Sequence, residues 1–292
     1  MLASSILMVK PKNFGFNPET ALDNEFQHNG HADVNAALLE FDRVVETLRS
    51  AGIEVELKED SDAPNKPDAI FPNNWVAFLP NQRLATFPMK AENRRTERRA
   101  EWVEEWSKNR DLIDLVDYEN TNQFLEGTGS IIFDHDNKMA YMARSQRSSD
   151  EPLFELCQKI DYQPYIFNAY NGSNPFYHTN VVMSLGENAV VLASETIAEG
   201  VEKLALLEIL NATRKQLIDI NLDQVLMFCG NVLQVMNKLG ERFWVMSETA
   251  HQAFNQSQLD VMKKDSGLII VNVENIEKIG GGGIRCMMAE VF

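Results

Sequence analysis

The chain contains few cysteines, and its acidic residues far outnumber its basic ones. Cys157, Cys229 and Cys286 are widely spaced and odd in number, so no disulfide framework is indicated and a reducing, cytoplasmic location is expected. Among 292 residues there are 43 Asp and Glu against 27 Lys and Arg, which gives a formal net charge of −16. This charge argues against nucleic acid as a partner, because phosphate binding needs clustered cations.

Long apolar runs and the usual metal or cofactor motifs are missing as well. No stretch approaches the ~20 apolar residues of a membrane span, and the first residues lack the pattern of a signal peptide. HExxH and paired CxxC are absent, and no carboxylate or cysteine clusters with His28 and His31. The run Gly280–Gly283 is not part of a strand–GxGxxG–helix element. We therefore expect no metal, no cofactor and no contact with membranes.

The sequence does contain a repeated pattern of strand, tight turn, strand, helix and strand. Turn residues between β-branched and aromatic runs predict hairpins, and apolar residues at helical spacing predict amphipathic helices. Complete units are predicted over residues 74–116, 129–167, 181–220 and 232–271. Their helices are expected at 92–108, from 151 onward, at 199–211 and at 251–264.

A fifth unit is divided between the two ends of the chain. Strands at 6–9 and 53–57 enclose a helix at 33–50, and a last strand at 286–291 is left to pair with the first. Five such units would form one circular α/β domain over residues 1–292, since no linker or composition shift divides the chain. A doubly wound parallel sheet is the rival architecture, and the recurrent hairpins disfavour it because they create antiparallel pairs.

The last segment of the chain contains the most informative residues. Consecutive glycines let the backbone pass close to a ligand, and Arg285 precedes Cys286, where its charge can favour the thiolate. Two interpretations of this segment stay open. Cys286 is either a nucleophile in a pocket wall or a small buried hydrophobe, the commoner role of a free cysteine.

Other candidates for chemistry lie where the predicted units begin or end. Glu126 comes shortly before a predicted strand, and His178 and Asp68 have similar positions in their units. Taken singly, a solvated glutamate, a structural histidine and a turn aspartate are the commoner roles. If the unit ends face one side of a ring, a thiol, an imidazole and a carboxylate converge there. Such a set supports covalent attack on an electrophilic carbon.

The only cluster of basic residues has the pattern of a surface helix. Arg94, Arg95, Arg98 and Arg99 alternate with glutamates at helical spacing. This arrangement is typical of a solvated, salt-bridged face, and we expect no role in the site for it.

With these residues established, the chain resembles the pentein superfamily of guanidino-group-modifying enzymes. The resemblance rests on matching segments, in the family's order and over nearly the full chain, at Asp68–Asn74, Leu125–Gly127, His178–Asn180 and Gly282–Met287. It implies a five-bladed α/β propeller without a cofactor. It also implies Cys286 as the nucleophile, His178 as the general acid/base and Glu126 as the carboxylate that orients a substrate nitrogen.

The same resemblance implies residues that bind the substrate. Asp68 would hold a substrate N–H, and Arg147 would bind the α-carboxylate, with Arg144 as the less favoured choice. Asn74 and Asn180 stand where deiminases usually carry aspartates. An asparagine offers a neutral carbonyl and an amide donor, which suits a neutral ureido group whose oxygen needs a donor.

Three functional hypotheses follow from the resemblance. The first is hydrolysis of a ureido or guanidino amino acid, citrulline to ornithine or an arginine derivative, through a covalent thio-intermediate. The second is an amidinotransferase that moves the amidino group of arginine to an amine. The third, of a different class, is a non-enzymatic, ribosome-binding pentein. The expected partner is a small guanidino or ureido amino acid, and the oligomeric state stays open, a homo-oligomer included.

Overall fold

The computed structural model describes residues 1–28 and 33–292, so His31 lies outside the described residues. In the described part, a three-stranded sheet recurs five times, and one short hairpin is separate from these sheets. In each complete unit the first two strands are antiparallel and the third is parallel to the second. The helix lies between the second and third strands, because a parallel pair needs a crossover connection.

The complete units, each in chain order, have the following bounds. They are β3 (Val76–Leu79), β4 (Arg83–Thr86), α2 (Glu92–Arg95), α3 (Ala100–Ser107) and β5 (Asp111–Asp114); β6 (Ile132–Asp134), β7 (Met139–Ala143), α5 (Asp150–Ile160) and β8 (Gln163–Phe167); β11 (Met183–Leu185), β12 (Ala189–Leu192), α6 (Val201–Ala212) and β13 (Gln216–Asp219); β14 (Leu233–Met236), β15 (Arg242–Ser247), α8 (Glu248–Ala253), α9 (Gln256–Lys263) and β16 (Gly267–Val271).

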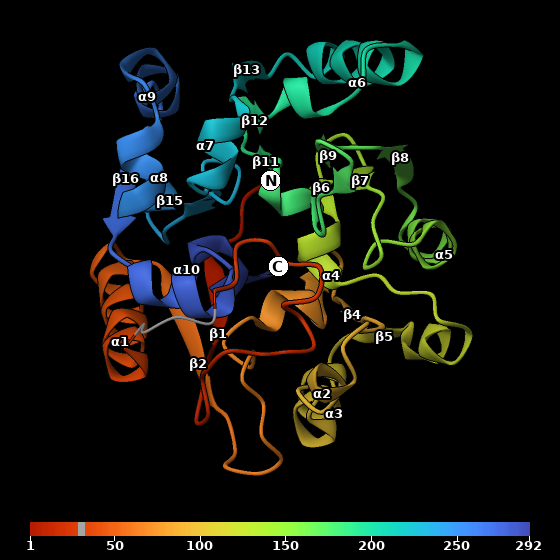
Figure 1. Ribbon diagram of the computed structural model, residues 1–292, viewed down its shortest axis with the longest axis vertical. Coiled ribbons are helices and arrows are strands. Elements are labelled where there is room, and N and C mark those ends of the chain that lie inside the picture. The colour runs from red at the N-terminus through yellow and green to blue at the C-terminus, as the bar shows by residue number, and fades with distance from the viewer. Residues whose placement is uncertain (29–32) are drawn as a thin grey trace.

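The divided unit joins the two ends of the chain, as the sequence predicts. Its elements are β1 (Ser5–Lys10), α1 (Val34–Ser50), β2 (Glu54–Glu59) and β17 (Ala289–Val291). β1 pairs parallel with β2 and antiparallel with β17, with Ser5 opposite Val291. The α/β class with small mixed sheets is therefore confirmed. In Figure 1 the sheets surround a common centre, and α1, α3, α5, α6 and α9 lie at the periphery.

Shorter elements connect the units. They are α4 (Gly127–Ser130), α7 (Leu222–Leu226), α10 (Glu274–Gly280), the hairpin β9 (Tyr170–Asn171) and β10 (Asn174–Pro175), and the 3-10 turns η1 (Pro72–Asn74), η2 (Val116–Thr121), η3 (Thr179–Val181), η4 (Ser194–Thr196) and η5 (Ile284–Met287). No helix in the described residues has the length and apolar character that a bilayer crossing requires.

Two predicted helices are each divided in the structure. The helix predicted at 251–264 is interrupted at Phe254 because the next residue, Asn255, caps α9 and forms a capping box with Gln258. The helix predicted at 92–108 is interrupted between α2 and α3. There Arg94 and Glu97 turn inward as a buried pair, and the chain makes tight turns around them. The apolar spacing predicted one continuous helix in each case, but a local cap in one and a long-range ion pair in the other divide it.

Four predicted strand starts are also wrong. Asn74 lies in η1 and Val181 in η3, Gly129 lies in the single helical turn α4, and Cys286 lies in η5 rather than in the last strand. Gly127 begins α4 with a φ of 46°, and a Cβ there would stand 2.2 Å from the carbonyl oxygen of Asn73. Only glycine fits such a close approach, which lets η1 and α4 meet.

The short segments that directly precede β3, β6, β11 and β17 come together. α4 contacts both η1 and η3, and η1 contacts η5. Each of these segments is short and lies at the inner end of its sheet. Side chains from distant parts of the sequence therefore gather at one place in the molecule.

Candidate active site

The gathered segments enclose a small cavity of about 20 Å³, room for about one water molecule. Its walls come from the chain before α1, from η1 and the residues just before it, from α2, from the connection between β7 and α5, from the residues just before η3, from η5 and from the end of α10. The lining residues are Thr20, Asn24, Asp68, Phe71, Asn74, Arg94, Arg147, Tyr177, His178, Gly280, Gly282 and Cys286. Most of the residues predicted from the sequence are therefore neighbours in space.

The thiol of Cys286 faces this cavity and is in contact with two amides. The residue is only 4% exposed, and its sulfur accepts from Asn231 Nδ2 at 3.2 Å and from Asn180 Nδ2 at 3.6 Å. Burial raises the pKa of the thiol, although the two amides and the charge of Arg285 oppose this shift. Burial thus acts against the thiolate that the charge of Arg285 favours.

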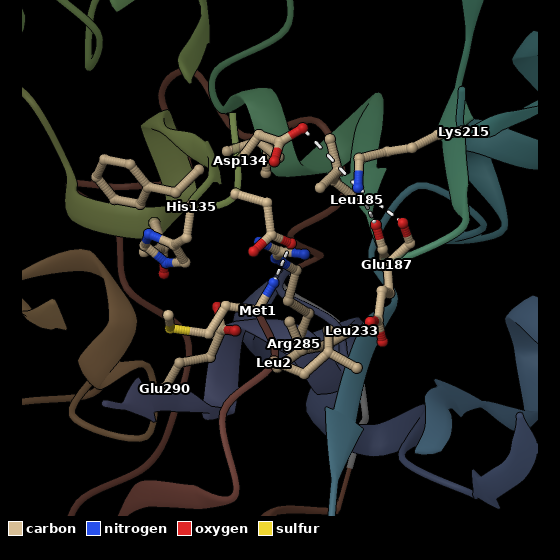
Figure 2. Close-up of a pocket in the computed structure, with 15 residues that line it drawn as sticks. Met1, Leu2, Asp134, His135, Leu185, Glu187, Lys215, Leu233, Arg285 and Glu290 are labelled. Carbon is tan, nitrogen blue, oxygen red and sulfur yellow. Dashed lines mark hydrogen bonds and ion pairs between the residues drawn. The ribbon is translucent and has the colours of Figure 1, made fainter. Parts of the chain in front are cut away.

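Arg285 influences the sulfur only from a distance. Its side chain turns away from Cys286 into a separate pocket that Asp134, Lys215 and Glu290 also line (Figure 2). Its guanidinium donates to Ser184 Oγ at 2.9 Å and to the carbonyl of Val232 at 3.0 Å. The arginine before the cysteine therefore serves mainly to anchor the turn η5.

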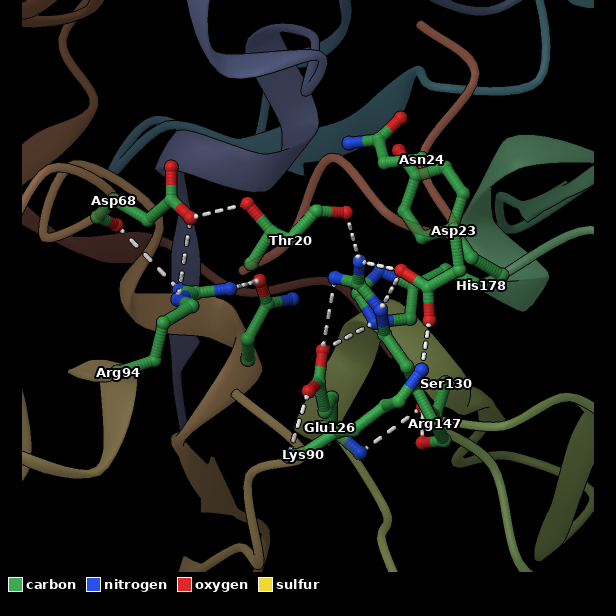
Figure 3. Close-up of polar contacts among 12 residues, drawn as sticks. Thr20, Asp23, Asn24, Asp68, Lys90, Arg94, Glu126, Ser130, Arg147 and His178 are labelled. Atoms are coloured by element: carbon green, nitrogen blue, oxygen red, sulfur yellow. Dashed lines mark hydrogen bonds and ion pairs between the residues drawn. The ribbon is translucent and has the colours of Figure 1, made fainter. Parts of the chain in front are cut away.

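His178 and Glu126 form a buried pair beside the thiol. His178 Nε2 lies 2.8 Å from Glu126 Oε2, and both residues are almost fully buried (Figure 3). Burial lowers the pKa of His178 although the glutamate opposes this. Burial alone would raise the pKa of Glu126, but Arg147 and His178 hold it well below its usual range. An ionised carboxylate can only accept, so we place the imidazole proton on Nε2 and leave Nδ1 free to take a proton.

Glu126 lies behind His178 rather than in the cavity wall. Its Oε1 accepts from the backbone N–H of Lys90 at 3.1 Å, and Arg147 Nη1 lies 3.5 Å from Oε2. The carboxylate thus orients the imidazole. The sequence prediction that it also holds a substrate nitrogen is not tested by this arrangement.

Three atoms around the cavity are buried without a hydrogen-bond partner among the described residues: Asp68 Oδ1, Asn74 Nδ2 and Asn180 Oδ1. We call them the three open polar atoms. Buried polar atoms are rarely left unpaired, so each marks a place where a ligand atom is expected. Two of them are acceptors and one is a donor, which complements a group with several N–H bonds and one acceptor.

The orientations of Asp68 and Asn74 are set by their neighbours. Arg94 Nη1 donates to Asn74 Oδ1 at 2.7 Å, and because arginine cannot accept, the amide nitrogen must point the other way. Asp68 Oδ2 accepts from Asn17 Nδ2 at 2.7 Å and from Thr20 Oγ1 at 3.0 Å, so Oδ1 is left open. Burial raises the pKa of Asp68 in spite of the nearby Arg94.

Of the two arginines considered for a substrate carboxylate, Arg147 lines the cavity and Arg144 does not. Arg144 is on the surface, where Nη2 pairs with Asp150 at 2.8 Å. The guanidinium of Arg147 stacks 5.0 Å from the ring of Tyr177. It is already engaged, because Nε donates to Asp23 Oδ1 at 3.0 Å and Nη2 donates to the carbonyl of Thr20 at 2.8 Å (Figure 3).

Several site residues were missed or misjudged from the sequence. The prediction of a solvated face is wrong for Arg94, which is 2% exposed and helps to form the cavity wall. Asp23 and Asn24 come from the segment before α1, which shows no periodicity that could have flagged them. Asn231 could have been found, because it precedes the first strand of its unit just as Asn74 and Asn180 precede theirs.

A metal has no obvious place in this site. Within residues 1–28 and 33–292, no group of three or more His, Cys, Asp or Glu side chains could hold an ion. The site chemistry is instead that of a thiol, a neutral imidazole with a free nitrogen, and a carboxylate that orients it. This combination supports nucleophilic attack followed by proton transfer to a leaving group.

Solved structures with the same fold are enzymes of guanidino compounds. The N-terminal domain of ArgZ, an arginine dihydrolase from cyanobacteria captured with its substrate, matches with a TM-score of 0.78 at 14% identity, over 98% of this chain and 97% of that domain. DDAH from Pseudomonas aeruginosa, complexed with citrulline, matches with a TM-score of 0.71 at 16% identity, over 99% and 100% of the two chains. At such identities the likeness establishes the fold. Comparison with curated protein sequences found no match.

A family match over nearly the whole chain, together with the shared fold, places the protein among the guanidino-group-modifying enzymes of the pentein superfamily. The model of one family matches residues 10–292, and the chain belongs to that family: N,N dimethylarginine dimethylhydrolase, eukaryotic. The protein is therefore an enzyme that acts on non-peptide C–N bonds.

Proposed function

We propose that the protein hydrolyses the guanidino group of arginine or an N-methylated arginine, with Cys286 as a covalent nucleophile. The observation that carries this proposal is the pair of open acceptors, Asp68 Oδ1 and Asn180 Oδ1, near a thiol and an imidazole. A guanidinium has N–H groups for Asp68 Oδ1 and Asn180 Oδ1. The family of the chain and the arginine dihydrolase that shares its fold support a guanidino substrate.

The raised thiol pKa also favours a cationic substrate. A guanidinium placed against the sulfur stabilises the thiolate by Coulombic attraction, whereas a neutral group does not. Binding of the substrate would then help to generate the nucleophile. As the sulfur of Cys286 attacks the central guanidino carbon, the proton of the thiol passes to Nδ1 of His178. The C–N bond of the tetrahedral adduct then breaks, and the departing amine takes that proton from His178. A water molecule, deprotonated at Nδ1 of His178, then breaks the C–S bond and releases a ureido product.

Citrulline is the second candidate substrate, and Asn74 is the observation that favours it. The open Nδ2 of Asn74 is a donor, and a ureido oxygen needs a donor that an aspartate would not supply. Arg147 remains our choice for the α-carboxylate. In that role the substrate would replace Asp23 on the guanidinium, or would bind alongside it.

A substrate panel tests the proposal. Purified protein is incubated with arginine, N-methylated arginines and citrulline, and ammonia, methylamines, citrulline and ornithine are measured. We expect turnover of a guanidino substrate and none with Cys286→Ala. A folded wild-type protein that converts no member of the panel would refute the proposal. Addition of glycine or ornithine as acceptors distinguishes an amidinotransferase, because the amidino group then appears on the added amine.

We also propose that the five sheets are the blades of a pseudo-symmetric propeller in one domain over residues 1–292. The repeated strand order and the pairing of β1 with β17 support this arrangement. A single domain predicts one cooperative unfolding transition by calorimetry. Two separated transitions would contradict it.

A further inference from the structure

The sulfur of Cys286 has a second amide neighbour that the proposed reaction does not use. Asn231 lies just before β14, is 4% exposed, and points Nδ2 at the sulfur from 3.2 Å. Asn180 approaches the same sulfur at 3.6 Å, and its Oδ1 is one of the three open polar atoms. The two amides therefore differ: the oxygen of Asn180 is left open, whereas both polar atoms of the Asn231 side chain have partners.

The orientation of the Asn231 side chain is determined by its other contacts. Its Oδ1 accepts from the backbone N–H of Arg285 at 3.2 Å, so the NH₂ group must be on the side of the sulfur. The same Nδ2 lies 3.4 Å from the carbonyl oxygen of Asn180. Asn231 thus links the start of β14 to the turn η5 that contains the nucleophile.

Two glycines leave the space that this link requires. A Cβ on Gly283 would stand 2.6 Å from Asn231 Oδ1, and a Cβ on Gly230 would stand 2.0 Å from the carbonyl oxygen of Val181. The first contact would displace the side chain of Asn231, and the second would require a backbone shift. The last glycine before Ile284 in the glycine-rich segment is thus explained by Asn231 rather than by a ligand.

We propose that Asn231 is a positioning residue that holds the Cys286 sulfur in place and stabilises its negative charge. An amide N–H bonds more strongly to a thiolate than to a thiol, because the acceptor is then charged. The bond is made before substrate arrives and remains when the sulfur leaves the carbon at the end of the cycle. This inference rests on the proposed role of Cys286, but it concerns the ionisation of the thiol and can be tested without any substrate.

The test is the pH dependence of Cys286 alkylation by iodoacetamide, with the modified peptide identified by mass spectrometry. Asn231→Ala removes the donor, and we expect the midpoint of the rate profile to move up by about one pH unit. Asn231→Asp replaces the donor with a carboxylate oxygen, and a larger upward shift is expected. Asn237→Ala is the matched control. Asn237 is an equally buried asparagine that bonds to Ala51 and Glu241 and should leave the midpoint unchanged.

If Asn231→Ala does not fold, Asn231→Ser is used, because serine is small and retains a weaker donor. The midpoint of the serine variant should lie above that of the wild type, by less than the shift of about one pH unit expected for Asn231→Ala. A folded variant at position 231 whose midpoint equals that of the wild type overturns the inference. The outcome is independent of the substrate panel. A shifted midpoint in a protein without turnover would support the inference on Asn231 and refute the proposed function. Turnover with an unshifted midpoint would support the proposed function and refute the inference.

Discussion

Cys286 and Cys229 are buried to a similar degree, yet they lie in two regions with different chemistry. Cys229 is packed in an apolar cluster, and its thiol donates to the carbonyl oxygen of Ala250 at 3.4 Å. Burial raises the pKa of this thiol well above its usual range. Around Cys286, two amide donors contact the sulfur, and His178 lines the same cavity. The two cysteines are similarly exposed, so the polar atoms around each sulfur, not its exposure, make the difference.

The largest expected effect separates the two cysteines directly. Cys286→Ala should lower turnover by about 10³-fold or more, because the covalent step is lost. Cys229→Ala should leave kcat within about twofold while lowering stability slightly, since it removes only packing. Steady-state kinetics on both variants checks this. Equal losses in the two would mean that the comparison is wrong.

The next effect concerns the carboxylate that orients His178. Glu126→Gln keeps the size of the side chain but replaces a charged acceptor with a neutral amide. We expect kcat to fall by about 10²-fold, and the imidazole pKa to fall further because the opposing negative charge is gone. NMR titration of His178 and a pH–rate profile provide the measurements. An unchanged pH–rate profile would show that Glu126 has no role in the reaction.

A glycine substitution tests how closely the site is packed. At Gly129 a Cβ would stand 2.5 Å from Asn74 Nδ2 and 2.7 Å from His178 Nδ1. Gly129→Ala should therefore displace both groups and lower kcat/KM by about 10- to 100-fold. Gly15→Ala is the control, since a Cβ at that position meets no atom within 4 Å among the described residues. Similar kinetics for the two variants would contradict the geometry.

The smallest effect concerns stability, near the region of Cys229. Glu277 Oε2 accepts from Thr249 Oγ1 at 2.8 Å, next to Ala250, and Glu277 Oε1 has no partner among the described residues. Burial raises the pKa of Glu277 to about 7. Because the folded state binds this proton more tightly than the unfolded state, the contribution of Glu277 is most favourable below about pH 4.5 and is lost as the pH rises through 7.

Glutamine does not ionise, so Glu277→Gln removes that loss. The difference in free energy of unfolding between the variant and the wild type should therefore be more favourable to the variant at pH 8 than at pH 5, by on the order of 1–3 kcal/mol. Denaturant unfolding at the two pH values is the measurement. Glu208→Gln, at an exposed position of α6, should show no such difference. A gain of the same size at both pH values would mean that the effect is not due to ionisation.

The predicted repeat was largely correct because it depends on local patterns. Hairpin turns and apolar periods are encoded within a few residues, and the structure reproduces every predicted unit with its hairpin and closing strand. The errors fall where a contact from elsewhere in the chain decides the conformation. Arg94 and Glu97 interrupt a predicted helix because they pair in the interior. The predicted strand start near Gly127 is a helical turn instead, because the backbone there lies close to the carbonyl oxygen of Asn73.

The site could be predicted in part for a related reason. Cys286, His178, Asp68 and Asn74 lie at the starts or ends of units, and the fold brings these positions to one cavity. The same rule, applied to the unit that starts at β14, would have included Asn231. Asp23 and Asn24 follow no such rule, because the segment before α1 reaches the cavity only through tertiary packing.

The amino-acid sequence alone determined the repeated units, the joining of the two chain ends and the set of reactive side chains, because each depends on residue type and short-range order. Only the tertiary structure decided the burial of Arg94, the partner of Arg147 and the ionisation of Cys286. Those properties depend on desolvation and on contacts between residues far apart in the chain, which no local pattern encodes.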